Sequence, residues 1–247
     1  MEQTREKKAV IVGATSGIGY EVAMILLKEG WRLGIAGRRE ELLKKIRSEA
    51  PERISIRVID ICKEEADEEL MKLIDEVGGM NLYLHSSGIG KQNFELEKEI
   101  ELNTLETNGT GFTRMVTTAF RYFQQHGGGH LAVISSIAGT KGLGIAPSYS
   151  ATKRFQNTYI YALEQLARMK KLQITFTDIR PGFVATAILN DSKHYPMLMR
   201  PEKVAQSIVK GLKRHKRVLV IDGRYRILVF FWKLIPAWLW KRLPIRN

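Results

Sequence analysis

The sequence predicts an α/β protein built on a doubly wound parallel sheet of about seven strands, with helices on both faces. Short apolar segments of strand length alternate with amphipathic segments of helical period along most of the 247 residues. A glycine-spaced turn joins the first strand to the first helix, as in sheets that bind ligands at their carboxyl edge. Hydrophobic residues make up 44% of the chain, which is enough for one large domain core.

The alternation places each expected element. Strands are expected at residues 8–12, 31–36, 53–59, 80–84, 130–135, 173–179 and 218–221, and helices at 20–28, 38–49, 63–77, 96–126, 149–170 and 202–213. We expect Ser148 to cap the helix that begins at Tyr149. Two glycines follow Asn108 inside segment 96–126, and each costs a helix about 1 kcal/mol relative to alanine. They predict a distortion that frees the Asn108 carbonyl to hold a water.

The net charge of +13 is concentrated at one end of the chain. Residues 210–247 hold eleven Lys/Arg and one Asp, so they carry +10 and leave +3 for the remainder. We treat residues 1–222 as one α/β domain and residues 223–247 as a basic, Trp-rich tail. Tryptophan and leucine in the tail form an apolar surface and not spaced stacking platforms, so we expect no nucleic-acid partner.

Cysteine usage indicates a reducing compartment. Cys62 is the single cysteine, which excludes an internal disulfide, and no Cys/His cluster has the spacing of metal ligands. The apolar segment 9–12 is too short for the core of an export signal. We expect a cytoplasmic protein with a metal-free site.

The glycine turn after the first strand indicates a dinucleotide site of the Rossmann type. Gly13 permits the tight turn, Gly17 lets the backbone approach a pyrophosphate at the helix N-terminus, and Gly19 lets helix and strand pack closely. The alternative is a tight turn that binds no ligand.

The end of the second strand favours NADP(H) as the cofactor. An acidic residue there would bind a ribose 2′-hydroxyl, but the chain has Arg38 and Arg39, which attract a 2′-phosphate. The alternative is that both arginines only begin a solvated helix. Asp60, at the end of the third strand, is equally suited to accept a bond from the adenine amino group or to cap a turn.

Three side chains between residues 136 and 153 form a plausible acid–base site. Tyr149 and Lys153 are four residues apart, so on a helix they share one face about one turn apart. A cation beside a phenol favours the phenolate and lowers the phenol pKa from about 10. Ser136 lies at a strand's carboxyl edge, where it can hold a substrate oxygen. The alternative is an ordinary exposed Tyr–Lys helix pair.

Taken together, residues 7–222 resemble the short-chain dehydrogenase/reductase family. The resemblance rests on motifs in the right order: Gly13-x-x-x-Gly17-x-Gly19, Asp60, Asn108-x-x-Gly111, Ser136, Tyr149-x-x-x-Lys153 and Pro181-Gly182-x-Val184-x-Thr186. It implies that Tyr149 exchanges a proton with the substrate oxygen, that Ser136 positions that oxygen, and that Lys153 holds the nicotinamide ribose and lowers the Tyr149 pKa. It also implies that Asn108 anchors a water that relays protons to Lys153.

The resemblance also implies the cofactor contacts. These are Gly13, Thr15, Ser16, Gly17, Ile18, Gly19, Arg38, Arg39, Asp60, Ile61, Ser87, Gly88, Tyr149, Lys153, Pro181, Gly182, Val184 and Thr186. The chain departs from the family at Val12, where threonine is usual, and at His85-Ser86-Ser87-Gly88, where Asn-Asn-Ala-Gly is usual. For His85 we expect a structural or local role.

These observations predict an NADP(H)-dependent oxidoreductase that reduces a ketone to a secondary alcohol. We favour a lipophilic substrate such as a 3-keto lipid of the sphingoid or acyl type; a sterol or bile-acid ketone is the alternative. A non-catalytic NADP-binding sensor is the alternative of another class. The resemblance further suggests a homodimer through helices 96–126 and 149–170. Residues 187–200, with Tyr195 and Met197 to Met199, suit either a substrate lid or plain loop packing.

The tail is the part that the family does not explain. Its apolar stretch 227–240 has fourteen residues and is interrupted by Lys233 and Pro236, whereas a membrane span needs about 20. Projected as one helix, Arg226, Lys233 and Lys241 share a narrow sector opposite an apolar face. That pattern predicts peripheral contact with the inner face of a membrane through residues 224–247. The alternative is packing on the domain or on a second subunit.

Overall fold

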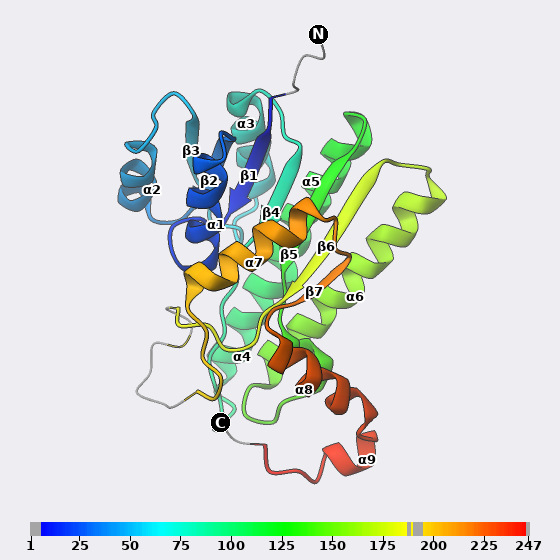
Figure 1. The fold of residues 1–247 in the computed structure, drawn as a ribbon. Coiled ribbons are helices and arrows are strands. Elements are labelled where there is room, and N and C mark those ends of the chain that lie inside the picture. Colours follow the sequence, from blue (N-terminus) through cyan, green and yellow to red (C-terminus); the bar gives the residue numbers. More distant parts are fainter. Residues whose placement is uncertain (1–5, 187–188, 190–194, 246–247) are drawn as a thin grey trace.

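Seven strands form one parallel sheet in the computed structural model, which describes residues 6–186, 189 and 195–245 (Figure 1). Their order across the sheet is β3-β2-β1-β4-β5-β6-β7. Strands β1 to β3 are added toward one edge of the sheet and β4 to β7 toward the other, so the strand order reverses between β1 and β4. This confirms the doubly wound sheet, and the reversal is where such sheets bind ligands at their carboxyl ends. The strands are β1 (Lys8–Val12), β2 (Arg32–Gly37), β3 (Ile54–Val58), β4 (Leu82–His85), β5 (Gly129–Ile134), β6 (Ile174–Arg180) and β7 (Val218–Val220).

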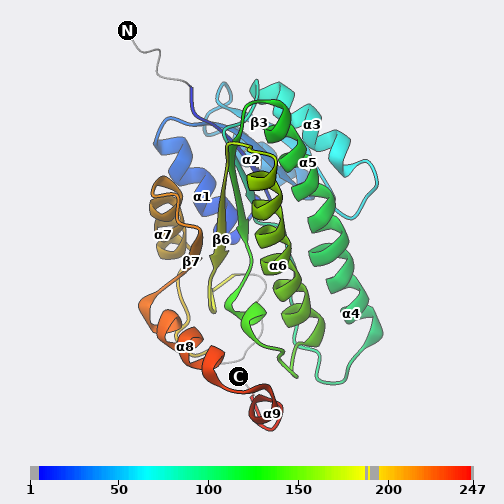
Figure 2. The same ribbon diagram turned by 90° about the vertical axis from the view of Figure 1, so that its right-hand side faces the viewer.

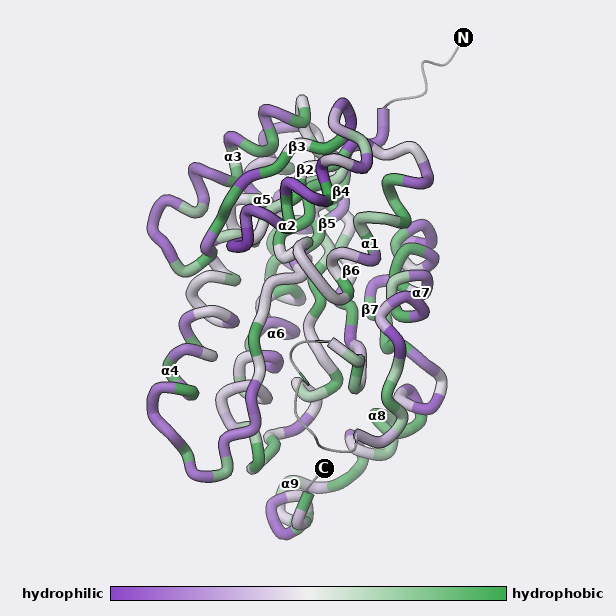
Figure 3. Tube along the Cα trace, turned by 90° about the vertical axis from the view of Figure 1, so that its left-hand side faces the viewer, coloured by the Kyte–Doolittle hydropathy of each residue, from purple (hydrophilic) through white to green (hydrophobic). Residues whose placement is uncertain are grey.

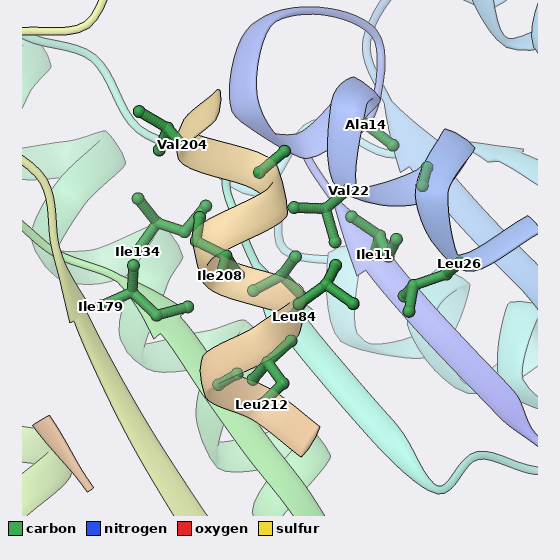
Figure 4. Close-up of a cluster of buried hydrophobic side chains, with 14 of the residues drawn as sticks. Ile11, Ala14, Val22, Leu26, Leu84, Ile134, Ile179, Val204, Ile208 and Leu212 are labelled. Carbon is green, nitrogen blue, oxygen red and sulfur yellow. The ribbon is translucent and has the colours of Figure 1, made fainter. Parts of the chain in front are cut away.

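Helices cover both faces of the sheet (Figure 2). The face of α1, α2 and α7 encloses one buried cluster, part of which Figure 4 shows, with Leu26 from α1, Leu84 from β4 and Ile208 from α7. The face of α3, α5 and α6 encloses the second, which includes Tyr83 and Phe112. The helices are α1 (Gly17–Lys28), α2 (Glu40–Arg47), α3 (Ala66–Val77), α4 (Lys98–Leu105), α5 (Phe112–Gln125), α6 (Pro147–Met169), α7 (Pro201–Lys213), α8 (Gly223–Leu234) and α9 (Ala237–Trp240).

Two helices near the site differ from their sequence-based expectation. Segment 96–126 is interrupted by a π-helical turn, Glu106–Gly111, which separates α4 from α5. The distortion expected beside Asn108 is therefore present. The cap expected at Ser148 is wrong, because α6 begins at Pro147 and Ala146 is the capping residue. Proline is favoured in the first helical turn because its missing N–H would lack a helical partner there.

The tail also differs from the single helix that was projected from its sequence. Ile235 has extended backbone, so α8 ends at Leu234 and α9 begins at Ala237, after Pro236. Lys241 follows α9, and the shared sector of Arg226, Lys233 and Lys241 therefore does not exist. A proline has no N–H and restricts the residue before it to extended backbone, which ends the first helix.

Candidate active site

The link between β5 and α6 carries the predicted serine. Ser136 is the second residue after the end of β5, and its Oγ accepts a hydrogen bond of 3.0 Å from the Ala138 amide. That bond begins a short 3-10 turn, Ile137–Thr140. The Ile137 amide donates to the Pro181 carbonyl over 3.1 Å, so the carboxyl ends of β5 and β6 are tied together.

Tyr149 lies in the first turn of α6, close to both Ser136 and Lys153. The Lys153 ammonium is 5.8 Å from the centre of the Tyr149 ring. Burial raises the pKa of the Tyr149 phenol above 10, and a hydrogen bond with Ser136 opposes that rise. The lowering of this pKa expected from Lys153 is not among the causes of the shift, of which burial is the largest. A phenol with a raised pKa keeps its proton and can donate it.

Lys153 is 4% exposed and is held by two acceptors. Its Nζ donates to the Ile134 carbonyl over 3.2 Å and to Gln156 Oε1 over 3.0 Å. Burial lowers the pKa of Lys153 to about 8, and the nearby Asp178 carboxylate opposes this. At neutral pH the side chain is therefore a buried cation close to the Tyr149 ring.

Asn108 is fully buried in the π-helical turn, and its side chain is hydrogen-bonded to the loop after β4. Its Oδ1 accepts from the Ile89 amide over 2.9 Å, and its Nδ2 donates to the Ile89 carbonyl over 2.7 Å. The Asn108 main-chain carbonyl accepts a bond of 2.9 Å from Gln156 Nε2. The Gln156 side-chain amide therefore links the Asn108 carbonyl to Lys153, whose Nζ donates to its Oε1. The expected water at this carbonyl stays a prediction.

Sequence reasoning missed Gln156, although a signal was present. It is three residues after Lys153 and seven after Tyr149, positions that share one helix face. It also missed a buried network below the site, centred on Asp178, which is 0% exposed. The Asp178 carboxylate accepts bonds from Ser135, Asn157 and Arg180. This network ties α6 to β5 and β6, the elements that carry the site.

The turn between β1 and α1 fits a pyrophosphate. Helix α1 has no side-chain cap and no acidic residue in its first turn, so its first N–H groups are available to an anion. Gly17 has φ +57°, a conformation that glycine adopts without strain. A Cβ on Gly13 would lie 2.5 Å from the Ser87 amide nitrogen, so only glycine lets the β1 and β4 loops meet. A Cβ on Gly19 would collide with the Gly13 carbonyl oxygen.

The two arginines after β2 differ in their surroundings. Arg39 reaches back over the glycine turn, where its Nη2 donates to Thr15 Oγ1 over 2.7 Å and to Ser16 Oγ over 2.6 Å. Arg38 is exposed and has no hydrogen bond within the part of the chain that the structure describes. Of the two arginines, Arg39 is the one that is held at the glycine turn.

The residues after β3 and β4 complete the rim. Asp60 Oδ1 accepts from the Cys62 amide over 3.1 Å, which is a local turn and leaves its second oxygen for another donor. The Ile61 carbonyl accepts from Arg114. His85 is buried against Phe112, and burial followed by repulsion from Lys153 lowers its pKa to about 3. It stays neutral, as suits a structural role.

The Pro181–Thr186 segment lies opposite the glycine turn. The Thr186 methyl group would lie 3.1 Å from a Cβ on Gly17, and Thr186 Oγ1 donates to the Val184 carbonyl over 3.3 Å. Gly182 is contacted from the tail, because a Cβ there would collide with the Tyr225 ring. Part of the expected lid, residues 187–188 and 190–194, lies outside the described residues.

The remaining predicted contacts fall on the same rim. Ile18 is in the first turn of α1, and Ser87 and Gly88 follow β4. A Cβ on Gly88 would lie 3.4 Å from Lys153 Nζ, so this loop touches the predicted acid–base site. Across residues 6–186, 189 and 195–245, no group of three His, Cys, Asp or Glu side chains is placed to hold a metal.

A doubly wound sheet with a glycine-lined anion site and a Tyr–Lys pair at one edge defines a dinucleotide-dependent oxidoreductase acting on a C–OH/C=O pair. The short chain dehydrogenase family model matches residues 7–196. The chain belongs to this family.

Relatives and solved structures agree with that assignment. An uncharacterised oxidoreductase of Myxococcus xanthus strain DK1622 is 30% identical over 223 residues, 87% of each chain. One of Staphylococcus aureus strain MRSA252 is 28% identical over 224 residues, 87% of this chain and 94% of that protein. The structure of ElxO with NADP bound superposes with a TM-score of 0.78 at 24% identity, over 90% of this chain and 99% of that one. A variant of actinorhodin polyketide ketoreductase with NADPH gives 0.76 at 27% identity, over 90% and 98%.

Proposed function

We propose that the protein is an NADP(H)-dependent reductase that converts a ketone to a secondary alcohol. The observation that carries the proposal is the arrangement at the carboxyl edge of β5, where Ser136, Tyr149 and Lys153 converge. It is supported by the solved neighbours, one titled with NADP and the other, a ketoreductase, with NADPH. When bound, NADPH would supply the hydride.

The side chains divide the remaining work. Ser136 would hold the substrate oxygen, and Tyr149, whose raised pKa keeps it protonated, would give that oxygen its proton as the carbonyl carbon is reduced. Lys153, a cation below pH about 8, would stabilise the phenolate left behind and hold the nicotinamide ribose. Solvent then returns the proton to Tyr149. A raised phenol pKa favours reduction over oxidation, because oxidation needs the phenolate as base.

NADP(H) is favoured over NAD(H) by the position of Arg39. Its bonds to Thr15 and Ser16 hold the guanidinium beside the turn that would receive the adenosine ribose. A 2′-phosphate there would meet a cation held in advance, and no acidic side chain of α1's first turn opposes it. Gly13, Gly17, Gly19 and the α1 N-terminus would bind the pyrophosphate.

The test of the reaction is NADPH oxidation measured against a ketone panel of sugars, acyl chains and sterols. A lipophilic ketone should be reduced fastest, and the 3-keto acyl and sphingoid types are preferred over sterol or bile-acid ketones. Reduction of sterols alone would favour the alternative substrate. Binding of NADPH with no turnover of any ketone would favour a sensor and overturn the reductase.

The preference for a lipophilic substrate rests on the tail. The inner face of α8 packs on the site, where Tyr225 Oη accepts from the Phe183 amide over 3.1 Å and contacts the Pro196 carbonyl at 3.0 Å. At α9, Trp240 Nε1 donates to the Gly142 carbonyl over 2.7 Å. Gly142 lies between Ser136 and Tyr149 in the chain. The tail is therefore beside the loops that would admit the substrate.

The outer face of α8 presents an apolar stripe to solvent. Figure 3 shows the hydrophobic residues along α8 in green. We call this apolar stripe the outer stripe; it consists of Ile227, Phe230, Phe231 and Leu234, each between 58% and 63% exposed. Their spacing of three and four residues places them on one side of the helix. Trp238, 63% exposed, extends the apolar surface at α9. None of the described helices is long and apolar enough to span a membrane.

We propose an anionic membrane surface as the partner of the outer stripe. Residues 223–245 contain five Lys/Arg and no Asp or Glu, and Asp222, which caps α8, pairs with Arg224 at 2.8 Å, so the apolar stripe is flanked by a net positive charge. Anionic headgroups complement that charge, whereas a second copy of the same face would repel it. A lipid substrate would then reach the site without crossing water.

Vesicle sedimentation tests this surface. The protein should co-sediment with phosphatidylcholine vesicles that contain phosphatidylglycerol, less at high salt, and not with phosphatidylcholine alone. Phe230→Ser with Phe231→Ser should abolish co-sedimentation, and Phe94→Ser, at a 72% exposed position elsewhere, should not. Point substitutions are preferred to removing residues 224–247, because Tyr225 is 1% exposed and packs on Gly182. Co-sedimentation that survives the double substitution would refute the proposal.

We also propose a homodimer through α4 and α6. Leu102 and Leu105 on α4 and Tyr161 on α6 are 52%, 54% and 67% exposed. Figure 2 shows α4 on the side of the molecule away from α8. Light scattering should give a dimeric mass, and Leu105→Glu should give a monomer. A monomeric wild-type protein at micromolar concentration would refute it.

A further inference from the structure

The buried amide of Gln156 forms a direct connection between two of the predicted catalytic residues. Its Nε2 donates to the Asn108 carbonyl over 2.9 Å, and its Oε1 accepts from Lys153 Nζ over 3.0 Å. The side chain is 0% exposed. Both ends of the amide are therefore satisfied by the site, in a space where water does not compete.

The π-helical turn makes this connection available. A regular α-helix would use the Asn108 carbonyl in its own ladder, but the turn Glu106–Gly111 shifts the hydrogen-bond pattern, and that carbonyl accepts from α6. The Asn108 side chain is engaged by both backbone groups of Ile89. Only its main-chain oxygen is directed to Gln156.

We propose that Gln156 is a positioning residue that aims the Lys153 ammonium, its amide taking the place of a water between Lys153 and the Asn108 carbonyl. The proposal rests on the proposed reductase function and deepens it. Two of the three Lys153 N–H bonds are taken, by Ile134 and Gln156, which leaves one for the ribose or the phenol.

The replacement has a chemical consequence. A water can accept a proton at the same atom from which it donates one, but an amide accepts at oxygen and donates at nitrogen. The bridge therefore holds Lys153 and passes no proton to Asn108. Tyr149 must recover its proton through the open side of the site.

Titration of Lys153 in the protein without ligand tests the bridge directly. Lysine labelled with ¹³C at Cε reports the pKa by NMR, and the Lys153 signal is assigned by its loss in Lys153→Met. The wild-type pKa should be about 8. Gln156→Met removes a bond that favours the charged amine and should lower the pKa by about one unit or more. Gln156→Glu places a carboxylate at the same point and should raise it.

A third variant tests the equivalence with water. Gln156→Ala leaves room for a water between the Asn108 carbonyl and Lys153, whereas methionine fills the space with apolar atoms. The pKa in Gln156→Ala should therefore lie between those of wild type and Gln156→Met. Equal pKa values in the Ala and Met variants would overturn the replacement of a water. Gln165→Met, at an exposed position on the same helix, is the matched control and should leave Lys153 unchanged.

Turnover separates this inference from the proposed function. The alkaline limb of the kcat/KM profile for ketone reduction should move with the Lys153 pKa, down in Gln156→Met and up in Gln156→Glu. If ketones are reduced but Lys153 titrates identically in all variants, the bridge is refuted and the reductase stands. If Lys153 shifts as expected but no ketone is reduced, the bridge stands and the reductase fails.

Discussion

Replacement of Arg39 by alanine should weaken NADPH binding selectively. The guanidinium is held by bonds of 2.7 Å to Thr15 and 2.6 Å to Ser16, so little ordering is needed when a phosphate arrives. A hydrogen bond to a charged group contributes about 1.5–3 kcal/mol, and each 1.4 kcal/mol is tenfold in affinity. Arg39→Ala should therefore reduce NADPH affinity about 10- to 150-fold. NADH, which has no 2′-phosphate, should lose less than about threefold.

Titration calorimetry with both nucleotides at one fixed salt concentration measures the difference. Arg47→Ala is the matched control, because Arg47 is an exposed arginine on α2. Arg38→Ala should have the smaller effect of the two site arginines, since nothing holds its side chain over the turn. Equal weakening of NADPH and NADH, or no weakening of NADPH, would refute the role of Arg39. Wild-type protein that binds both nucleotides equally would refute the cofactor preference itself.

The other predictions concern chemistry, pH and packing. Tyr149→Phe should abolish ketone reduction but leave the affinity for NADPH nearly as in wild type, because only the proton donor is lost. Tyr161→Phe on the same helix is the control and should keep full activity. Ketone turnover in Tyr149→Phe would contradict the assignment. Burial lowers the pKa of His85 to about 3 and of His130 to about 4, so below pH 6.5 the unfolded state binds protons first. The free energy of unfolding in urea should therefore fall as the pH drops from 6.5 to 4, by up to about 1.4 kcal/mol per pH unit for each histidine. A His130→Gln variant whose unfolding free energy changes with pH as steeply as that of wild type would refute the contribution of His130. Gly182→Ala should lower the melting temperature by the equivalent of about 1–3 kcal/mol, since its Cβ would collide with Tyr225, and a melting temperature equal to that of wild type would show that the tail does not pack there.

The sequence by itself determined the sheet, the edge of the sheet that carries the site, and the main chemistry. Alternating strand and helix periods fix a parallel α/β fold, because parallel strands need crossover helices. The motifs that contain Gly13, Ser136 and Tyr149 follow strands or begin helices, so their common edge follows from the fold. The single interruption near Asn108 followed from glycine's low helix propensity.

The tertiary structure decided which groups meet across elements. The Asn108–Gln156–Lys153 bridge joins the π-helical turn to α6, and the two ends are 48 residues apart in the chain. The raised pKa of Tyr149 comes from burial by segments that no local pattern identifies. Local propensity reports the backbone of one segment, but a hydrogen bond between segments depends on the packing of both. For the same reason the sequence showed an apolar tail, and only the packing of Tyr225 and Trp240 showed which of its faces is left for solvent.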